Sequence, residues 1–191
     1  MKALGIEQGG SNSESSSGGV WFGDDGPYKN VFTNESPEDK ILVIWGPWAS
    51  WVNKKQPLIT ASLPKGASTT VSFAKDQTGG WAAVGKNTQL VNGQISETWG
   101  EYTFNFYGVV DVSRLPNMNG SKMSISTPTC TSDFDRFVFV CKNANVCTHD
   151  YDLLNCGPES QPWANYGIAE GAPTGGCGGV GDSADIKTSF Y

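Results

Sequence analysis

The chain has 191 residues and a formal net charge of −6, and no run of its residues is apolar for long enough to cross a membrane as a helix. Its length corresponds to one domain with a sizeable core. The negative charge repels nucleic-acid phosphates and anionic lipid surfaces, so neither nucleic acid nor a membrane is an expected partner.

Glycine and proline interrupt the sequence at short intervals. With 24 glycines and 10 prolines, apolar runs rarely exceed strand length. The nine phenylalanines, seven tryptophans and six tyrosines suit pleated, half-buried surfaces. The composition therefore predicts an all-β fold.

The N-terminal segment lacks the apolar side chains that a core requires. Residues 7–19 read EQGGSNSESSSGG, and such a segment cannot offset the entropy of ordering. We therefore predict a flexible arm over residues 1–19 and a single β domain over residues 20–191.

Short strands are predicted along the first half of this domain. Residues 40–51 form a buried strand that is interrupted at Gly46-Pro47, because proline cannot donate to a sheet ladder. Strands are also expected over 58–63 and 68–74, and the residues after Gly79-Gly80 resume an apolar pattern.

The clearest hairpin signal is Asn92-Gly93, because this pair adopts the positive φ angles of a type I′ turn. Residues 101–106 then alternate, which places Tyr102, Phe104 and Phe106 on one predicted buried face. Later segments continue the series, with strands over 109–112, 122–126, 134–141 and 184–190 and a short helical turn over 150–154. Strands at this spacing predict a sandwich or a barrel.

All five cysteines lie in the glycine-rich last third of the chain: Cys130, Cys141, Cys147, Cys156 and Cys177. Their spacings lack the paired short intervals of zinc sites, which favours disulfides and hence an extracellular compartment. Because five is odd, one thiol remains free within the chain, and the sequence does not choose among the pairings. The segment 175–181 is predicted to be flexible or rich in turns.

Two sequons agree with secretion. They begin at Asn34 and Asn119, which are the candidate glycosylation sites.

Several short motifs resemble known families. Gly-Gly-Trp-Ala at 79–82, Trp-Gly-Glu at 99–101 and Asp-Val-Ser at 111–113 resemble a secreted fungal allergen and effector-like family. The strand from Glu101, the Asp-Val-Ser that follows and the segment from Pro116 to Met118 resemble the broader thaumatin-like family.

This resemblance implies a thaumatin-like β-sandwich with disulfide-bonded, glycine-rich loops. Thaumatin-like proteins carry an acidic cleft that binds glucan and in some members weakly hydrolyses β-1,3-glucan; Glu101 and Asp111 fall on two of its acids. Pro116 stands where that pattern has a further aspartate, and the chain has fewer cysteines than the family.

Catalytic chemistry finds little support in the sequence. Glu97, Glu101 and Asp111 would lie near one another if their strands pair, as glycoside hydrolysis requires, but carboxylates on the polar face of a strand are usually solvated. We interpret the acids as a binding feature. His149 is the one histidine and lies in a cysteine-rich loop without a nucleophile motif, so a surface role is expected.

Three tryptophans surround Gly46-Pro47, namely Trp45, Trp48 and Trp51. The turn redirects the chain, so we expect at least one of them to be exposed for recognition, since exposed aromatic rings stack on sugars and anchor interfaces. A tryptophan-rich corner of the core is the alternative. Three others are expected in the core: Trp81, Trp99 and Trp163.

Three functional hypotheses follow. The first is a secreted, non-catalytic recognition protein of fungal effector or allergen type, which binds cell-wall glucan or a host extracellular protein. The second is an inhibitor of a host extracellular hydrolase such as a papain-like cysteine protease, and the third is a weak β-1,3-glucanase. We expect no metal or cofactor, and the candidate binding residues are Trp45, Trp48, Trp51, Glu101 and Asp111.

Overall fold

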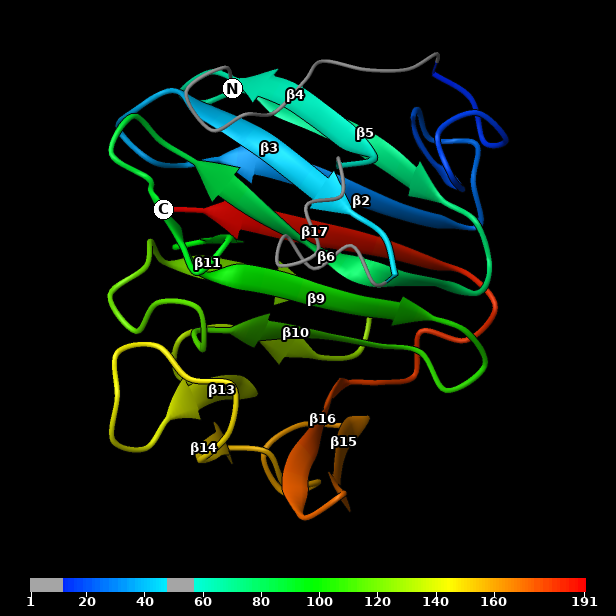
Figure 1. Cartoon of the computed structure of the whole chain (residues 1–191). Helices are drawn as coiled ribbons and strands as arrows, with labels where there is room; N and C mark the ends of the chain where they lie inside the picture. The colour runs from blue at the N-terminus through cyan, green and yellow to red at the C-terminus, as the bar shows by residue number, and fades with distance from the viewer. Residues whose placement is uncertain (1–11, 48–56) are drawn as a thin grey trace.

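A computed structural model describes residues 12–47 and 57–191 of the chain (Figure 1). Within these residues the regular structure consists of strands, without a helix. Accordingly, nothing in the described ranges could cross a membrane as a helix. The predicted all-β fold is confirmed.

The smaller sheet of the described chain has six strands in the order β1-β5-β2-β17-β11-β12. Their bounds are β1 (Val20–Phe22), β2 (Tyr28–Asn34), β5 (Ser68–Phe73), β11 (Met123–Ser126), β12 (Thr131–Ser132) and β17 (Ala184–Phe190). β17 lies at the centre, parallel to β2 and antiparallel to β11. The C-terminal strand thus joins the first and second halves of the chain.

The larger sheet of the described residues has nine strands. The order β14-β13-β10-β9-β6-β3-β4 forms its main path, and the hairpin β15–β16 joins it through β10. Their bounds are β3 (Lys40–Trp45), β4 (Ile59–Leu63), β6 (Gln77–Val84), β9 (Trp99–Phe104), β10 (Val109–Ser113), β13 (Val138–Cys141), β14 (Tyr151–Leu154), β15 (Ala164–Ala169) and β16 (Ala172–Cys177). A separate hairpin pairs β7 (Leu90–Val91) with β8 (Gln94–Ile95).

The two sheets pack face to face as a β-sandwich, and the main core lies between them. Alternation along each strand decides which side chains enter it: Tyr102 and Phe104 of β9 face the core, whereas Glu101 and Thr103 lie on the outer face of the larger sheet. A smaller apolar cluster on that outer face contains Trp45 and Trp99, whose rings meet edge to face at 4.9 Å.

Most predicted strands are present, with small shifts at their ends. The Asn92-Gly93 turn is confirmed, with φ of 52° and 79°. Phe106 was predicted to share the buried face of Tyr102, but β9 ends at Phe104 and Phe106 is 78% exposed in the following turn. The helical turn predicted over 150–154 is also wrong, because Tyr151–Leu154 is β14 and pairs with β13.

The hairpin β15–β16 is the main element that the sequence analysis missed. It occupies part of the glycine-rich region and stands beyond β10 at the lower edge of the molecule (Figure 1, orange). Glu170 and Gly171 form its two-residue turn, both with positive φ. Gly175 and Gly176 lie within β16, so this part of the segment 175–181 is regular strand.

Two disulfides are formed, as predicted. Cys130–Cys177 links the chain just before β12 to the end of β16, and both half-cystines are buried in the main core. Cys141–Cys147 closes a short loop after β13. Cys156 is the free thiol.

The described part of the predicted N-terminal arm, residues 12–19, is folded into turns against β1. The Asn12 side chain accepts a hydrogen bond from the Phe22 backbone N–H at 2.7 Å and donates one to the Phe22 carbonyl at 3.1 Å. Asn12 thereby continues the hydrogen bonding along the edge of β1.

Two glycines of the motifs that we noted in the sequence make room for tryptophan rings. A Cβ on Gly80 would lie 2.7 Å from Cζ2 of Trp45. Gly100 pairs directly with Trp81 across β6 and β9, and a Cβ there would overlap the Trp81 indole. Trp81 is fully buried, so its ring has no free space to move into.

We predict that Gly100→Ala lowers the free energy of unfolding by about 1–3 kcal/mol, because the added methyl group overpacks the core against Trp81. Urea denaturation followed by tryptophan fluorescence measures the change. Gly167→Ala on β15 is the control, since its Cβ would make an ordinary contact with Thr174. Equal stability of the two variants would show that the Trp81 ring does not constrain position 100.

Candidate functional site

Two carboxyl side chains lie side by side on the outer face of the larger sheet. Asp111 of β10 is paired with Glu101 of β9. Residues directly opposite in an antiparallel pair have Cβ atoms about 4.5–5.5 Å apart. The row continues through Gly80 of β6 to Trp45 of β3. Strand register therefore brings together three of the candidate binding residues from the sequence.

These acids line a cleft of about 460 Å³. Its floor is the outer face of β6, β9 and β10, and one wall is β16 with the end of β15. The opposite end is formed by β13, β14 and the loop before β14. The cleft is rich in hydroxyl and carboxyl groups, from Thr78, Glu101, Thr103, Asp111, Thr148, Tyr151 and Thr174.

β16 approaches the acid pair closely because it carries glycine at the crossing point. A Cβ on Gly176 would lie 2.8 Å from the Val110 carbonyl oxygen and 3.3 Å from Cβ of Asp111. The φ of Gly176, 149°, is also one that other residues rarely adopt. A larger residue here would push the wall of the cleft away from Asp111.

Burial sets the electrostatics of the pair. It raises the pKa of the Asp111 carboxyl well above its usual range, and the negative charge of Glu101 raises it further. Burial also raises the pKa of Glu101, which the Ser113 hydroxyl opposes by hydrogen bonding. The two groups together therefore resist carrying two negative charges.

Asp111 has an unmet hydrogen-bonding capacity. The residue is only 5% exposed, and its buried Oδ1 atom has no hydrogen-bond partner. Among the described residues that line the cleft there is no lysine or arginine. The site is thus an acidic, hydroxyl-rich cleft without a cation of its own.

Trp45 lies beside the cleft but is buried, with 4% exposure. Its ring packs on Gly80 and Trp99, so it supports the floor of the cleft. Trp48 and Trp51 lie outside the described residues. Trp81 and Trp99 are buried as predicted, whereas the prediction for Trp163 is wrong, since it is 64% exposed at the start of the hairpin.

Glu97 does not join the acid pair. Its carboxylate accepts hydrogen bonds from the Thr88 hydroxyl and from the Ser121 backbone N–H, each at 2.9 Å. It therefore ties the chain that follows β8 to two neighbouring segments. The sequence does not show that Glu97 lies apart from Asp111, because Glu97 and Glu101 are both acids that precede β10 by a short interval.

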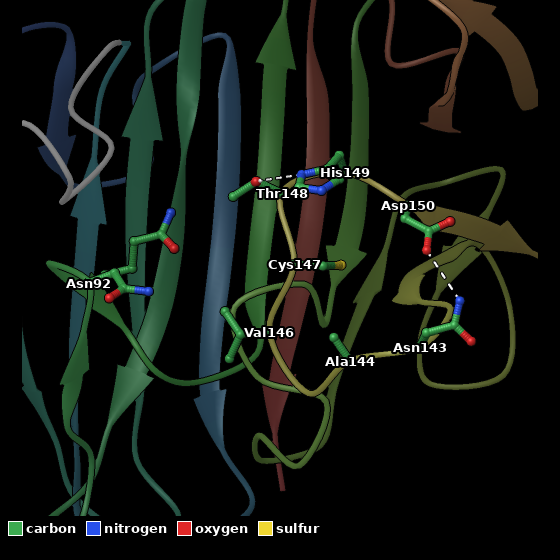
Figure 2. Close-up of a pocket in the computed structure, with 9 residues that line it drawn as sticks. Asn92, Asn143, Ala144, Val146, Cys147, Thr148, His149 and Asp150 are labelled. Atoms are coloured by element: carbon green, nitrogen blue, oxygen red, sulfur yellow. Dashed lines mark hydrogen bonds between the residues drawn. The ribbon is translucent and has the colours of Figure 1, made fainter.

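His149 lies in a second pocket of about 380 Å³, between the β7–β8 turn and the loop before β14 (Figure 2). Its Nδ1 atom and the Thr148 hydroxyl are 3.3 Å apart. Asp150 instead accepts a hydrogen bond from Asn143 at 3.2 Å, and the nearby Cys147 is held in its disulfide. Within the described ranges no three metal-binding side chains cluster.

The two sequons differ in accessibility. Asn34 is fully buried, and its Nδ2 atom donates hydrogen bonds to the Glu38 and Leu63 carbonyls at 2.8 Å each. A glycan on this nitrogen would disrupt both bonds. Asn119 is exposed and donates to Asn145 at 2.9 Å.

Sequence reasoning missed the residues that wall the cleft. Thr148 and Tyr151 belong to a segment interpreted as a surface loop and helical turn, and Thr174 belongs to the missed hairpin. The one available signal was Glu170-Gly171, a two-residue turn of the kind that joins hairpin strands.

The acid pair makes a prediction about stability and pH. A carboxyl whose pKa is higher in the folded protein binds its proton more tightly when folded, so stability is lost as pH rises from the unfolded pKa, about 4, through the folded pKa. As the pH rises above about 4, we expect the free energy of unfolding of the wild type to fall relative to that of Asp111→Asn, which has no carboxyl group to ionise at this position. Urea denaturation at a series of pH values measures the difference.

Asp24→Asn, which removes an exposed carboxylate, is the control and should follow the wild type. Parallel curves for the wild type and Asp111→Asn would contradict the buried state of the pair.

A family model matches most of the β domain. The model of the Allergen Asp f 4-like domain matches residues 24–155, which is more than half of the chain. The match contains Glu101 and Asp111 and ends before the β15–β16 hairpin. Among curated proteins, none matches the chain. On the extent of the family match, the chain belongs to the Allergen Asp f 4-like family.

Proposed function

We propose that this protein is a secreted, non-catalytic recognition protein that binds a cell-wall β-glucan in the cleft between the larger sheet and the β15–β16 hairpin. The observation that carries the proposal is the carboxyl pair Glu101–Asp111 in a concave, hydroxyl-lined site. Binding sites of this kind hold a ligand by a few convergent polar groups within a cleft of several hundred Å³.

The chemistry of the cleft suits a sugar. Each sugar hydroxyl both donates and accepts hydrogen bonds; the ionised carboxyl of the pair accepts them, and the protonated one can donate one. Hydrogen bonds to charged groups are the stronger ones, so the carboxyl pair would contribute most to orientation. At one end Tyr151 meets Phe139 edge to face at 5.8 Å, which offers an aromatic surface near the hydroxyl groups.

Membership of an allergen-like family and two disulfides are compatible with a secreted protein. The resemblance of the strands around Glu101 and Asp111 to thaumatin-like proteins supports glucan as the ligand class. A host protein remains the alternative partner, and affinity capture tests for it beside glucan.

A second candidate function, weak β-1,3-glucan hydrolysis, is favoured by one observation. The two carboxyls are neighbours, and burial raises the pKa of both, which favours one protonated and one ionised carboxyl. Retaining glycosidases use two carboxyls about 5 Å apart, one as acid and one as nucleophile. In that reaction the protonated carboxyl of the pair would protonate the leaving oxygen, and the ionised carboxyl would attack the anomeric carbon of the sugar.

We predict that the protein is retained on insoluble β-1,3-glucan and that Thr174→Arg reduces this retention at least about tenfold, a loss of about 1.4 kcal/mol in binding free energy. Thr174 is exposed on β16 and lines the cleft, so a long side chain there blocks the site without entering the core. Co-sedimentation over a range of glucan concentrations measures the affinity.

The matched control is Ser124→Arg, which adds the same charge to the smaller sheet and should bind like the wild type. Unchanged retention of Thr174→Arg would exclude the cleft as the glucan site. Capture of a protein from host extracellular fluid, with no retention on glucan, would replace glucan by that partner. Release of reducing sugar that Glu101→Gln abolishes would establish the hydrolase.

A further inference from the structure

No lysine or arginine stands against the acid pair among the described residues that line its cleft. Several other acids form ion pairs with lysine or arginine, as Asp182, Asp185 and Asp133 do. Asp111 is the one acidic residue among the buried polar residues that the structure describes, and its Oδ1 atom has no partner. Burial of the Asp111 carboxyl is costly, and neither an ion pair nor a hydrogen bond to Oδ1 offsets this cost.

This arrangement leaves room for a cationic ligand. Two adjacent carboxyls in one site share a proton when no cation is present, because ionising both is opposed by their mutual repulsion. A positive group placed against both would allow both to ionise. The cleft reaches the pair from solvent, since Glu101 and Asp111 both line it.

We propose that the cleft selects a saccharide that carries a protonated amine, namely a chain of β-linked glucosamine, and that the ammonium group is bound between Glu101 and Asp111. This inference rests on the proposed function, because it takes saccharide binding in the cleft as given and names the substituent that the site recognises.

An ammonium group fits the pair better than a hydroxyl group. It donates three hydrogen bonds and accepts none, which matches two carboxylates that accept only. As the ammonium binds, the O–H bond of the protonated carboxyl breaks and its proton passes to water or buffer, so the site exchanges one positive charge for another and no other bond changes. An N-acetyl group lacks the charge and adds bulk, and a neutral sugar hydroxyl cannot displace the proton.

The surrounding hydroxyl groups favour a sugar as the carrier of the amine. Thr78, Thr103 and Thr174 line the same cleft and can bond the remaining hydroxyls of a pyranose ring. A lysine side chain would bring the same ammonium group on an apolar stem, and its methylene groups cannot form hydrogen bonds with these threonine hydroxyls. A lysine peptide is therefore the competitor to test.

Isothermal titration calorimetry at mildly acidic pH tests the proposal with four probes. They are the tetramers of β-linked glucosamine, of N-acetylglucosamine and of β-1,3-linked glucose, and tetralysine. The glucosamine tetramer is expected to bind at least about tenfold tighter than each of the others. Titrations in two buffers of different ionisation enthalpy are expected to show the release of about one proton per bound ammonium group.

Variants of the pair locate the preference. Asp111→Asn and Glu101→Gln should each remove most of the tenfold preference for glucosamine over N-acetylglucosamine. Glu35→Gln, at an exposed acid that directly follows β2 of the smaller sheet, should retain it. Should Asp111→Asn fail to fold, the partly exposed Glu101→Gln still decides the question, together with the wild-type proton release.

The outcomes separate this inference from the proposed function. Equal affinity for the glucosamine and N-acetylglucosamine tetramers overturns the inference, while binding of the glucose tetramer leaves the proposed function intact. Equal affinity for tetralysine overturns the assignment to a sugar. A preference for glucosamine that survives both variants places the amine elsewhere and also overturns it.

Discussion

The register between β9 and β10 is the constraint on which the rest of the site depends. It places Glu101 opposite Asp111 on the outer face and sends Tyr102 and Val110 into the core. A slip of either strand by one residue would turn its acid inward and its neighbouring apolar side chain outward. The buried area between the sheets therefore maintains the acid pair, because the pair can separate only if the sandwich core is disrupted.

Glycine and tryptophan secure that register from both sides of the sheet. Trp81 covers Gly100 on the core face, and Trp45 covers Gly80 on the outer face. Each ring fills the space that a side chain on its glycine would occupy. The glycine therefore lets the tryptophan ring pack directly against the backbone of the neighbouring strand, which buries a large apolar area. The motifs that carry the resemblance to known families are in this way packing motifs next to the site, and their role in binding is indirect.

The last third of the chain turns a sheet surface into a cleft. β16 pairs with β10 at a single position and is linked by Cys130–Cys177 to the chain before β12, in the smaller sheet. Its glycines let the backbone pass close to Asp111, which excludes water from that carboxyl and raises its pKa. The glycine-rich composition of this region thus provides close approach, and the disulfide restricts how far the wall can move.

Local alternation, turn chemistry and cysteine spacing were enough to predict the class of fold, the Asn92-Gly93 hairpin and the presence of disulfides, and the resemblance to thaumatin-like proteins implied Glu101 and Asp111 as site residues. Which acids meet depends on strand pairing in the folded chain, since Glu97 and Glu101 look alike until the strands pair. The tertiary structure also decided the cysteine pairing, the burial of Trp45, the exposure of Trp163 and the wall formed by β16. Each of these features depends on contacts between segments far apart in the chain, and short-range sequence patterns do not specify such contacts.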